Sequence, residues 1–575
     1  MDPALRELLA DGDPDEIIEA IVRLAPGTNE LPEGVCEISR FAEIATVRIR
    51  RSDIERVWAH PSTRSLKAPR ALQFDGPEMS PESLSQLFDD GVRPRVPLGN
   101  RGKGVVVGVI DWGFDFGHPA FRDQNGRSRI RALWDQGAKG PSPRFGYGKV
   151  HTRADINAAL NTSRPYTALG YHPGKSDRGA GAHGTHVADI AAGTTRPGGG
   201  GVAPEADLVF VHLASGPLSG LANLGDSVRL LEAIDFIAEA AGDQPFVINM
   251  SIGRHGGPHT GLTLVEQAFD RFLEAAPDRL LVQSAGNYYL ARAHTSGRLQ
   301  PGGTHVIEWQ TNPGDRTPNE IEIWYSDRDT FEVQITPPGA NKAVAVKLGD
   351  ARGLYQKDGS EVARLYHRAY DPNTPDHHIE AFLGPEAPSG TWKIELKGQI
   401  IEDGRWHAWI ERDSGSRRNQ SRLPNSSADP RHTIGSICNG FLPIAVGAAA
   451  EDSPTARPAP FASSGPTRDG RQKPDLAAPG FRIQAAKSTP RWSSSPRPRT
   501  VKMSGASQAA PHVCGIAAAM LSDLPRGLGI HDLRAHLFNL ARPWQRPRQA
   551  DLPRLGAGLL SSRLIAGGDT EFSKE

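Results

Sequence analysis

A serine set among small residues is the first candidate for chemistry in this chain. Ser507 lies in the segment MSGASQAAPHV, and an apolar run follows at once. Gly505 allows a tight turn, and Pro511 suits the first turn of a helix. The segment therefore predicts a hydroxyl at the N-terminal end of a helix that faces a cleft. Taken alone, it fits an ordinary structural turn equally well, because small residues with a proline are common in turns.

An acid and a base precede this serine. Asp111 ends the apolar run VVVGVI, as at the end of a buried strand, and His183 opens the small-residue segment HGTHVADIAAG. A serine hydroxyl needs an imidazole to take its proton, and the imidazole needs a carboxylate to fix its tautomer. Asp, His, Ser is one of the chain orders in which such triads occur.

Each of these residues also has an ordinary structural interpretation. Asp111 fits a strand-end turn, and His183 fits the neighbourhood of a helix N-cap. His186, about one helical turn further on, is assigned to packing and hydrogen bonding. Asp115 and His118 are interpreted as loop residues rather than as metal ligands. The catalytic interpretation depends on the joint pattern and not on any single residue.

Seven ordered segments resemble those of the subtilases, the subtilisin-like serine proteases. They cover most of residues 100–290 and 433–565 and read VGVIDWGFDFGHPAF, HGTHVADIAAG, GVAPEADLVFVHL, VINMSIG, VQSAGN, KPDLAAPG and SGASQAAPHVCG. One such motif is weak, but seven in the family's order are a specific signal. The resemblance implies an α/β fold, with a parallel sheet and helices on both faces. It also implies a serine endopeptidase that hydrolyses peptide bonds in protein or peptide substrates.

The resemblance assigns roles to individual residues. Asp111, His183 and Ser507 match the triad, and Asn287 matches the asparagine that donates its amide to the oxyanion. Substrate contacts are implied for Ser251, Ile252, Gly253, Ser284, Ala285 and Gly286. The first three match the segment that pairs with an extended substrate, and the last three match the walls of the main specificity pocket. Such walls predict a preference for medium or large apolar side chains.

Two positions beside the serine depart from the family pattern. Ala506 replaces the usual threonine, and Gln508 replaces the usual methionine. Ala506 keeps the turn small, whereas Gln508 is expected to line the cleft and to alter the oxyanion environment or the leaving-group side. The alternative function is a catalytically silent subtilase-fold protein that binds peptides. The intact acid, base, serine and asparagine favour the enzyme.

Composition and charge exclude several classes of partner. The chain has 575 residues, of which 66 are basic and 66 acidic, so net charge predicts no nucleic-acid or anionic-membrane partner. Its three cysteines do not make a disulfide framework, and no Cys/His cluster has zinc-ligand spacing. Calcium is common in the family, but no acidic loop has a suitable spacing. No metal site and no cofactor are therefore predicted.

The N-terminal sequence sets an expectation for location. MDPALRELLADGDPDEII is acidic and lacks the apolar core of a secretory signal, and no apolar run reaches the ~18 residues of a membrane span. We expect a cytoplasmic protein, with a secreted protease bearing an unusual leader as the alternative. A cytoplasmic protease needs restraint, so we expect its own N-terminal domain to act as an intramolecular inhibitor. A regulatory protein is a further expected partner.

The N-terminal region has the pattern of a small α+β domain over residues 1–75. Strands are expected at 17–24, 36–41, 45–49 and 64–68, and a helix at 53–59 with Ser52 and Glu55 in a capping box. This domain resembles the inhibitory pro-segment of subtilases, with an unrelated small domain as the alternative. Residues 76–100 are Pro-rich and polar, as in a linker that contains a cleavage site. The chain would then be made as a self-inhibited zymogen.

The remainder divides into a catalytic domain and an insertion. Residues 101–290 and 433–575 are the two parts of the catalytic domain, in which alternating strands and helices predict a parallel sheet. Residues 121–182 are expected to decorate the cleft. Residues 291–432 read as short alternating strands and predict an inserted β-sandwich. Its tryptophans occupy strand positions, which favours core packing over carbohydrate binding: Trp309, Trp324, Trp392, Trp406 and Trp409.

Overall fold

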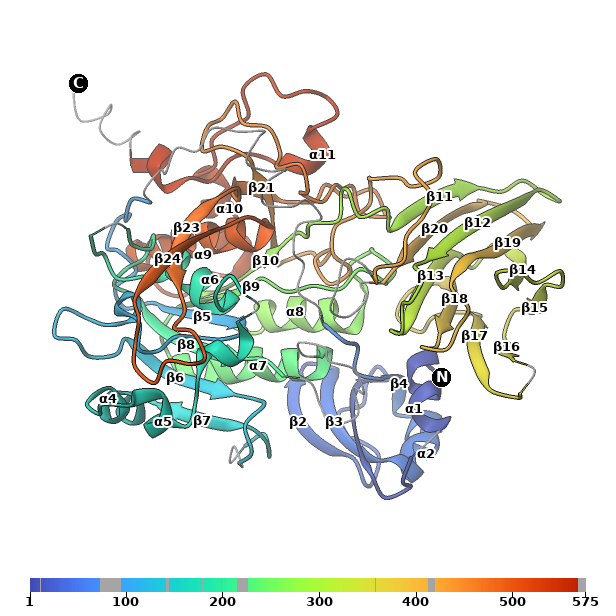
Figure 1. Ribbon diagram of the computed structural model, residues 1–575, viewed down its shortest axis with the longest axis horizontal. Helices are drawn as coiled ribbons and strands as arrows, with labels where there is room; N and C mark the ends of the chain where they lie inside the picture. Colours follow the sequence, from blue (N-terminus) through green and yellow to red (C-terminus); the bar gives the residue numbers. More distant parts are fainter. Residues whose placement is uncertain are drawn as a thin grey trace.

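The structure, a computed structural model, has three units: a catalytic unit built on an eight-stranded sheet, an N-terminal unit and an inserted unit (Figure 1). It describes residues 1–566 apart from residues 11, 73–94, 141–143, 178, 198, 215–225, 357 and 412–418. None of the helices in these described ranges is both long and apolar enough to cross a bilayer.

An eight-stranded sheet forms the centre of the catalytic unit, in the order β22-β21-β10-β9-β5-β8-β6-β7. Its strands are β5 (Val106–Asp111), β6 (Ile130–Asp135), β7 (Lys149–Thr152), β8 (Asp207–His212), β9 (Phe246–Met250), β10 (Arg279–Ser284), β21 (Ile444–Ala449) and β22 (Leu476–Pro479). All neighbours are parallel except β7, which is antiparallel to β6 at one edge. The apolar runs of β5, β9 and β21 are buried throughout, as expected for parallel strands covered on both faces.

Helices cover both faces of this sheet, which confirms the predicted fold class (Figure 1). The helix α6 packs against α9 on one face, whereas α7 and α8 lie on the other. The helices of this unit are α4 (Arg153–Leu160), α5 (Pro165–Leu169), α6 (His183–Ala192), α7 (Ser227–Ala241), α8 (Leu264–Glu274), α9 (Ala506–Asp523), α10 (Ile530–Asn539) and α11 (Leu552–Leu555), with short 3₁₀ turns at Pro119–Phe121 and Pro173–Ser176. A hairpin of β23 (Ile483–Lys487) and β24 (Arg499–Met503) leads into α9.

One expectation about this unit was incomplete. Residues 121–182 do more than decorate the cleft, because β6 pairs in parallel with β8 and extends the central sheet. The strand is held there by burial of Ile130, Leu133 and Trp134. The region therefore contributes to the core as well as to the surface.

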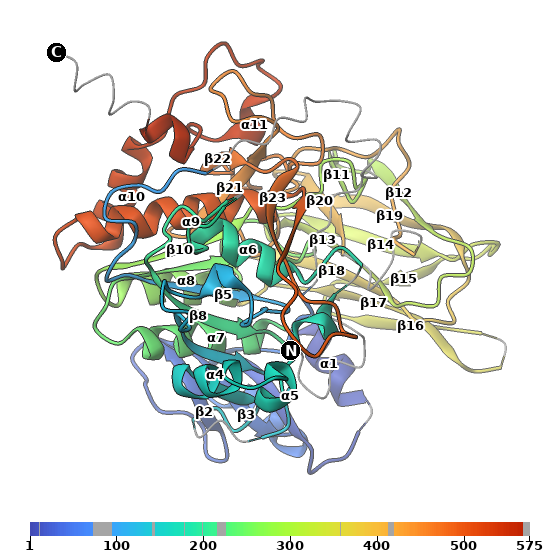
Figure 2. The ribbon, with the colours of Figure 1, turned by 60° about the vertical axis from the view of Figure 1, so that its left-hand side comes forward.

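The N-terminal unit is a four-stranded antiparallel sheet in the order β2-β3-β1-β4 with two helices. In both views its sheet lies beside α7 (Figure 1 and Figure 2). Its elements are α1 (Pro3–Ala10), β1 (Ile17–Leu24), β2 (Cys36–Phe41), β3 (Ile44–Arg50), a 3₁₀ turn at Arg51–Asp53, α2 (Ile54–Ala59) and β4 (Thr63–Lys67).

The capping box expected at Ser52 and Glu55 is wrong. The 3₁₀ turn occupies this position and runs directly into α2, whose N-cap residue, Asp53, already has helical dihedral angles and makes no side-chain capping bond. An N-cap side chain reaches the first free N–H groups from an extended backbone, and no residue here supplies one. The chain thus enters α2 through a tighter turn instead of a cap.

The insertion between Asn287 and β21 is a β-sandwich (Figure 1). One sheet has the order β11-β20-β13-β18-β17-β16 and the other the order β12-β19-β14-β15. The strands are β11 (His294–Arg298), β12 (Thr304–Thr311), β13 (Asn319–Ser326), β14 (Thr330–Thr336), β15 (Val344–Val346), β16 (Ala351–Tyr355), β17 (Glu361–Arg368), β18 (Asp376–Leu383), β19 (Gly390–Ile400) and β20 (Arg405–Ile410). All five tryptophans singled out from the sequence are buried, at 4% exposure or less, as expected for core residues.

Candidate active site

The carboxylate of Asp111 holds the imidazole of His183. Nδ1 of His183 lies 2.8 Å from Oδ1 and 2.9 Å from Oδ2 of Asp111. The backbone N–H of Trp112 also donates to Oδ1, at 2.7 Å. Asp111 is fully buried and His183 nearly so. Nδ1 must be protonated to donate to this carboxylate, which leaves Nε2 as the nitrogen that can accept a proton.

Backbone bonds fix the start of α6 beside the end of β5. The N–H of Gly184 donates to the carbonyl of Trp112 at 2.8 Å, and the N–H of Thr185 donates to that of Gly113 at 3.0 Å. His183 is the first residue of α6, as the small-residue segment predicts. The side chains of a strand end and a helix start are thereby brought together from positions 72 residues apart.

Ser507 lies in the first turn of α9, which packs against α6. The helix begins at Ala506, directly after Gly505, so Pro511 lies inside it and not in its first turn as expected. A proline has no N–H to donate to the carbonyl four residues earlier. That carbonyl is Ser507 O, and the hydroxyl of Ser251 donates to it at 3.1 Å. Ser251 thus replaces the helical bond that Pro511 removes.

This contact of Ser251 is the feature that the sequence analysis missed. Ser251 follows β9 and was assigned only to substrate pairing, yet its carbonyl also lies 3.5 Å from the hydroxyl of Ser507. Its hydroxyl additionally accepts from the side-chain amide of Asn249 at 3.0 Å. The spacing between Ser507 and Pro511 was the available signal, because it identifies a helical carbonyl that needs another donor.

Asn287 is oriented by the start of α9. The backbone N–H of Ala506 donates to Oδ1 of Asn287 at 2.9 Å. Because Oδ1 accepts this bond, Nδ2 is the donor end of the amide. Asn287 is 1% exposed and follows β10 by a short turn. A side-chain amide donor is therefore held next to the serine.

The other residues assigned to substrate binding lie at the ends of β9 and β10, which are neighbours in the sheet. Ile252 and Gly253 follow Ser251 and are buried. Ser284 ends β10, and Ala285 bonds through its backbone to Val446 and Gly435. The backbone at Gly286 has a φ of 107°, a conformation that favours glycine. The structure brings both segments to the same edge of the sheet as Ser507.

Two residues near the site have the structural roles expected for them. His186 lies near two carbonyls of the β23–β24 hairpin, with Nε2 at 3.0 Å from Ile483 O and 3.1 Å from Val501 O. Burial lowers the pKa of His186 to about 3, so its ring is neutral. Asp115 accepts from the hydroxyl of Tyr166 at 2.6 Å and so ties its loop to α5.

One acidic cluster in the described ranges has the geometry of a metal site. Glu320, Glu322 and Glu380 bring carboxylate oxygens within 4.8 Å of one another. Guanidinium groups already contact them, because Arg70 reaches Glu320 and Glu380, and Arg254 reaches Glu320 and Glu322. The cluster is therefore balanced by arginine side chains.

The sequence profile of the subtilase family matches residues 102–342 and 413–558. The chain belongs to the subtilase family. C5a peptidases of Streptococcus pyogenes are similar to it: that of serotype M3 is 26% identical over 470 residues, which is 78% of this chain and 37% of the relative. That of serotype M18 is 26% identical over 476 residues, 79% of this chain and 38% of the relative. The chain thus spans less than two fifths of these curated relatives.

A solved structure shows the same fold. The CspB protease of Clostridium perfringens superposes with a TM-score of 0.66 at 22% sequence identity, over 81% of this chain and 95% of that protein. The subtilase membership and this likeness agree with the order of strands and helices derived above. The matched family is one of serine peptidases, and its motifs fall on the residues described above.

Proposed function

We propose that this chain is a serine endopeptidase in which Ser507 is the nucleophile, His183 the general base and Asp111 the residue that orients His183. Ser507 attacks the carbonyl carbon of the scissile peptide bond while His183 takes the hydroxyl proton. The oxyanion is held by the N–H of Ser507 and the amide of Asn287. His183 then protonates the leaving amine, and water releases the acyl-enzyme.

The observation that carries this proposal is the bidentate approach of Asp111 to Nδ1 of His183. A buried carboxylate there favours the tautomer that a general base needs and stabilises the imidazolium that forms. The hydrogen bond from the Ala506 N–H to Oδ1 of Asn287 orients a second donor, the Asn287 amide, beside Ser507. Substrate would lie extended along Ser251, Ile252 and Gly253, with one side chain between Ser284, Ala285 and Gly286.

Active-site labelling tests the assignment of the nucleophile. A fluorophosphonate probe is expected to label the wild-type chain and not a Ser507→Ala variant. Ser522→Ala is the matched control, because Ser522 lies on the same helix and its hydroxyl donates to the carbonyl of Ala519. Labelling of Ser507→Ala at the wild-type rate would contradict the proposal, as would absence of labelling in all three proteins.

We further propose that residues 1–75 are an intramolecular inhibitor and that the chain is made as a zymogen. The N-terminal sheet packs against α7 and α8. Buried ion pairs join the two: Arg229 contacts Glu19 at 3.1 Å, and Arg48 contacts Glu232 at 2.9 Å. Phe41 meets Phe272 of α8 edge to face.

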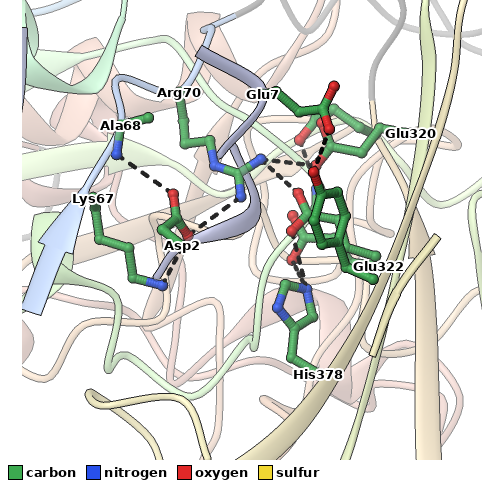
Figure 3. Close-up of polar contacts among 12 residues, drawn as sticks. Asp2, Glu7, Lys67, Ala68, Arg70, Glu320, Glu322 and His378 are labelled. Carbon is green, nitrogen blue, oxygen red and sulfur yellow. Dashed lines mark hydrogen bonds and ion pairs between the residues drawn. The ribbon is translucent and has the colours of Figure 1, made fainter. Parts of the chain in front are cut away.

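The β-sandwich also contacts the N-terminal unit, and Figure 3 shows Arg70 beside Glu320 of the sandwich. Arg70 donates to Glu380 at 2.7 Å, and Lys67 donates to Asp371 of the sandwich at 2.7 Å. Asp2 accepts from Lys67 at 3.2 Å and so lies within the same cluster.

The mass of the purified chain tests the zymogen proposal. Wild type is expected to lose roughly the first 70–100 residues, whereas Ser507→Ala stays whole. The new N-terminus would also report the enzyme's own cleavage preference. If both proteins stay whole while the probe labels Ser507, the peptidase assignment stands and spontaneous self-processing is refuted.

We propose a cytoplasmic location, with a regulatory protein as a second restraint. The cysteines in the described ranges form no disulfide: Cys36 is exposed, and Cys438 and Cys514 are buried. Cysteines outside disulfides suit a reducing compartment. Fractionation of cells that make the native protein tests the location. Recovery of the protein outside the cells would overturn the cytoplasmic assignment.

A further inference from the structure

The side-chain amide of Gln508 is buried, and its nitrogen makes no hydrogen bond to the described residues. Gln508 follows Ser507 in the first turn of α9 and is 2% exposed. Among the described residues, its Nε2 has no hydrogen-bond partner. A buried donor without an acceptor destabilises a protein, and native structures contain few of them. Stability of the fold therefore does not explain why a glutamine stands at position 508.

Three polar groups surround the point that a Cβ atom on residue 505 would occupy if it were not glycine. A Cβ placed on Gly505 would lie 2.9 Å from Oε1 of Gln508, 3.5 Å from Nδ2 of Asn287 and 3.6 Å from the backbone nitrogen of Ser507. The last two are the donors proposed above for the oxyanion. An oxyanion needs donors at about 2.7–3.1 Å, and such contacts are often longer before substrate binds. Since Gly505 has no side chain, this position is left for a substrate atom.

The amide of Gln508 can present either of its ends to this position. A half-turn about its last torsion exchanges Oε1 and Nε2, and the two atoms are assigned by their hydrogen bonds. In the present orientation Oε1 faces this position, and Nε2 has no acceptor in the described part of the chain. An amide oxygen would repel an oxyanion, whereas Nε2 would donate to it.

We propose that Gln508 supplies a third donor to the oxyanion of the tetrahedral intermediate, an inference that rests on the proposed peptidase function. As Ser507 Oγ bonds to the carbonyl carbon, the C=O π electrons move to the oxygen and the hydroxyl proton moves to His183. Nε2 of Gln508 then donates to that oxygen beside Asn287 and Ser507 N. The usual methionine offers no donor, so this departure adds a catalytic contact.

The backbone of Gln508 is fixed independently of this role. The N–H of Gln508 donates to the carbonyl of Gly505 at 3.0 Å. The carbonyl of Gln508 lies 2.8 Å from Nδ1 of His512. A change of side chain therefore leaves the turn in place. This makes Gln508→Met, which restores the family's usual residue at similar length, a clean test of the amide alone.

Turnover of a chromogenic peptide amide measures the effect, with active sites counted by fluorophosphonate titration. Gln508→Met is expected to lower kcat by about tenfold to a hundredfold with KM unchanged, less than loss of a sole donor because two donors remain. A peptide aldehyde inhibitor, whose adduct carries the same oxyanion, is expected to bind more weakly by a similar factor. Gln508→Glu keeps the shape, removes the donor and is expected to lose at least as much.

Gln136→Met is the matched control. Gln136 is also buried, but its amide donates to the carbonyl of Arg229, away from the serine, so kcat per active site should not change. An unchanged kcat and inhibitor affinity in Gln508→Met would overturn the inference while wild-type labelling still supports the peptidase. Coupling between Gln508→Met and Asn287→Ala gives a second readout. Strictly additive losses would also contradict a shared oxyanion.

Discussion

Nη1 of Arg70 lies 2.7 Å from Oε1 of Glu380, although the two residues are 310 positions apart in the sequence. The same guanidinium group contacts Glu320 at 3.2 Å. Arg254 approaches Glu320 from the catalytic unit at 2.9 Å. Arg254 directly follows the proposed substrate-pairing residues ending at Gly253. One charge network thus connects the N-terminal unit, the sandwich and the edge of the proposed active site. Figure 3 shows the part of it that contains Arg70 and Glu320.

Removal of Arg70 is expected to loosen the N-terminal unit. Burial raises the pKa of Glu380 well above its usual range, and the Arg70 charge opposes that rise. Arg70→Met would remove a positive charge from beside the carboxylates of Glu320 and Glu380. Breaking a buried ion pair lowers the free energy of unfolding by about 3–5 kcal/mol. Chemical unfolding in a Ser507→Ala background, which prevents self-cleavage, measures the loss. Arg64→Met is the control, because Arg64 is exposed on β4, six residues before Arg70. Equal losses in the two variants would contradict the role of this network.

Local sequence patterns were sufficient to predict most of the fold. The apolar run before Asp111 and the small residues after His183 correctly indicated β5 and α6, because burial on both faces and close helix packing leave direct marks on a sequence. The alternation of residues 391–396 likewise identified part of β19. These elements depend on neighbours within a few residues, which is the range over which such patterns carry information.

Contacts between distant segments could not be predicted in this way. Nothing in the sequence near Arg70 indicates that its partners are Glu320 and Glu380, since charged residues are common and their pairing depends on how three units dock. The pairing of β6 with β8 was missed for the same reason. At the candidate site, the residue types were predictable, but the orientation of Asn287 by Ala506 required the folded backbone.

The pairing of Ser251 with Ser507 predicts a compensating double substitution. Ser251→Ala removes the donor to the Ser507 carbonyl and is expected to cost about 1–3 kcal/mol, because a buried acceptor is left unsatisfied. Pro511→Ala restores an N–H at the position that donates to this carbonyl in a regular helix. The double variant should therefore be more stable than the sum of the two single changes predicts. Urea unfolding of the four proteins measures the coupling, and additivity would refute the explanation.

Acid is expected to weaken the anchoring of α6 to the β23–β24 hairpin through His186. Burial lowers the pKa of His186 from 6.5 to about 3. The unfolded chain therefore binds a proton on this residue below pH 6.5 that the folded chain does not bind, so stability falls as the pH drops from 6.5 towards 3. The slope for one such proton is about 1.4 kcal/mol per pH unit. Above pH 6.5 this contribution is fully present.

His186→Gln isolates this contribution. The variant should lose stability at neutral pH but should lose less between pH 7 and pH 5 than wild type does. Unfolding free energies at the two pH values give the difference, and the exposed His531→Gln is the control. A pH dependence in His186→Gln equal to that of wild type would show that His186 is not responsible.

Two buried aspartates near the site are expected to differ sharply in their effect on turnover. Asp111→Asn should lower kcat by about 10⁴-fold, because an amide favours the wrong tautomer of His183. Asp115→Asn should lower stability, since Asp115 accepts from Tyr166 and Thr489, but should leave kcat per labelled site unchanged. Steady-state kinetics normalised to probe labelling separates the two effects. Similar losses of kcat in both variants would contradict the assignment of Asp111.

The proposed specificity pocket predicts which side chain precedes the cleaved bond. Ser284, Ala285 and Gly286 are small and carry no charge, so we expect a preference for medium or large apolar side chains at this position. A peptide library read by mass spectrometry measures the preference, and a wild-type preference for charged residues would contradict it. Ser284→Asp adds a carboxylate to one wall and should shift cleavage towards lysine and arginine, because the carboxylate pairs with a cation in a site shielded from water. If Ser284→Asp cleaves with unchanged preference, these residues do not form the pocket.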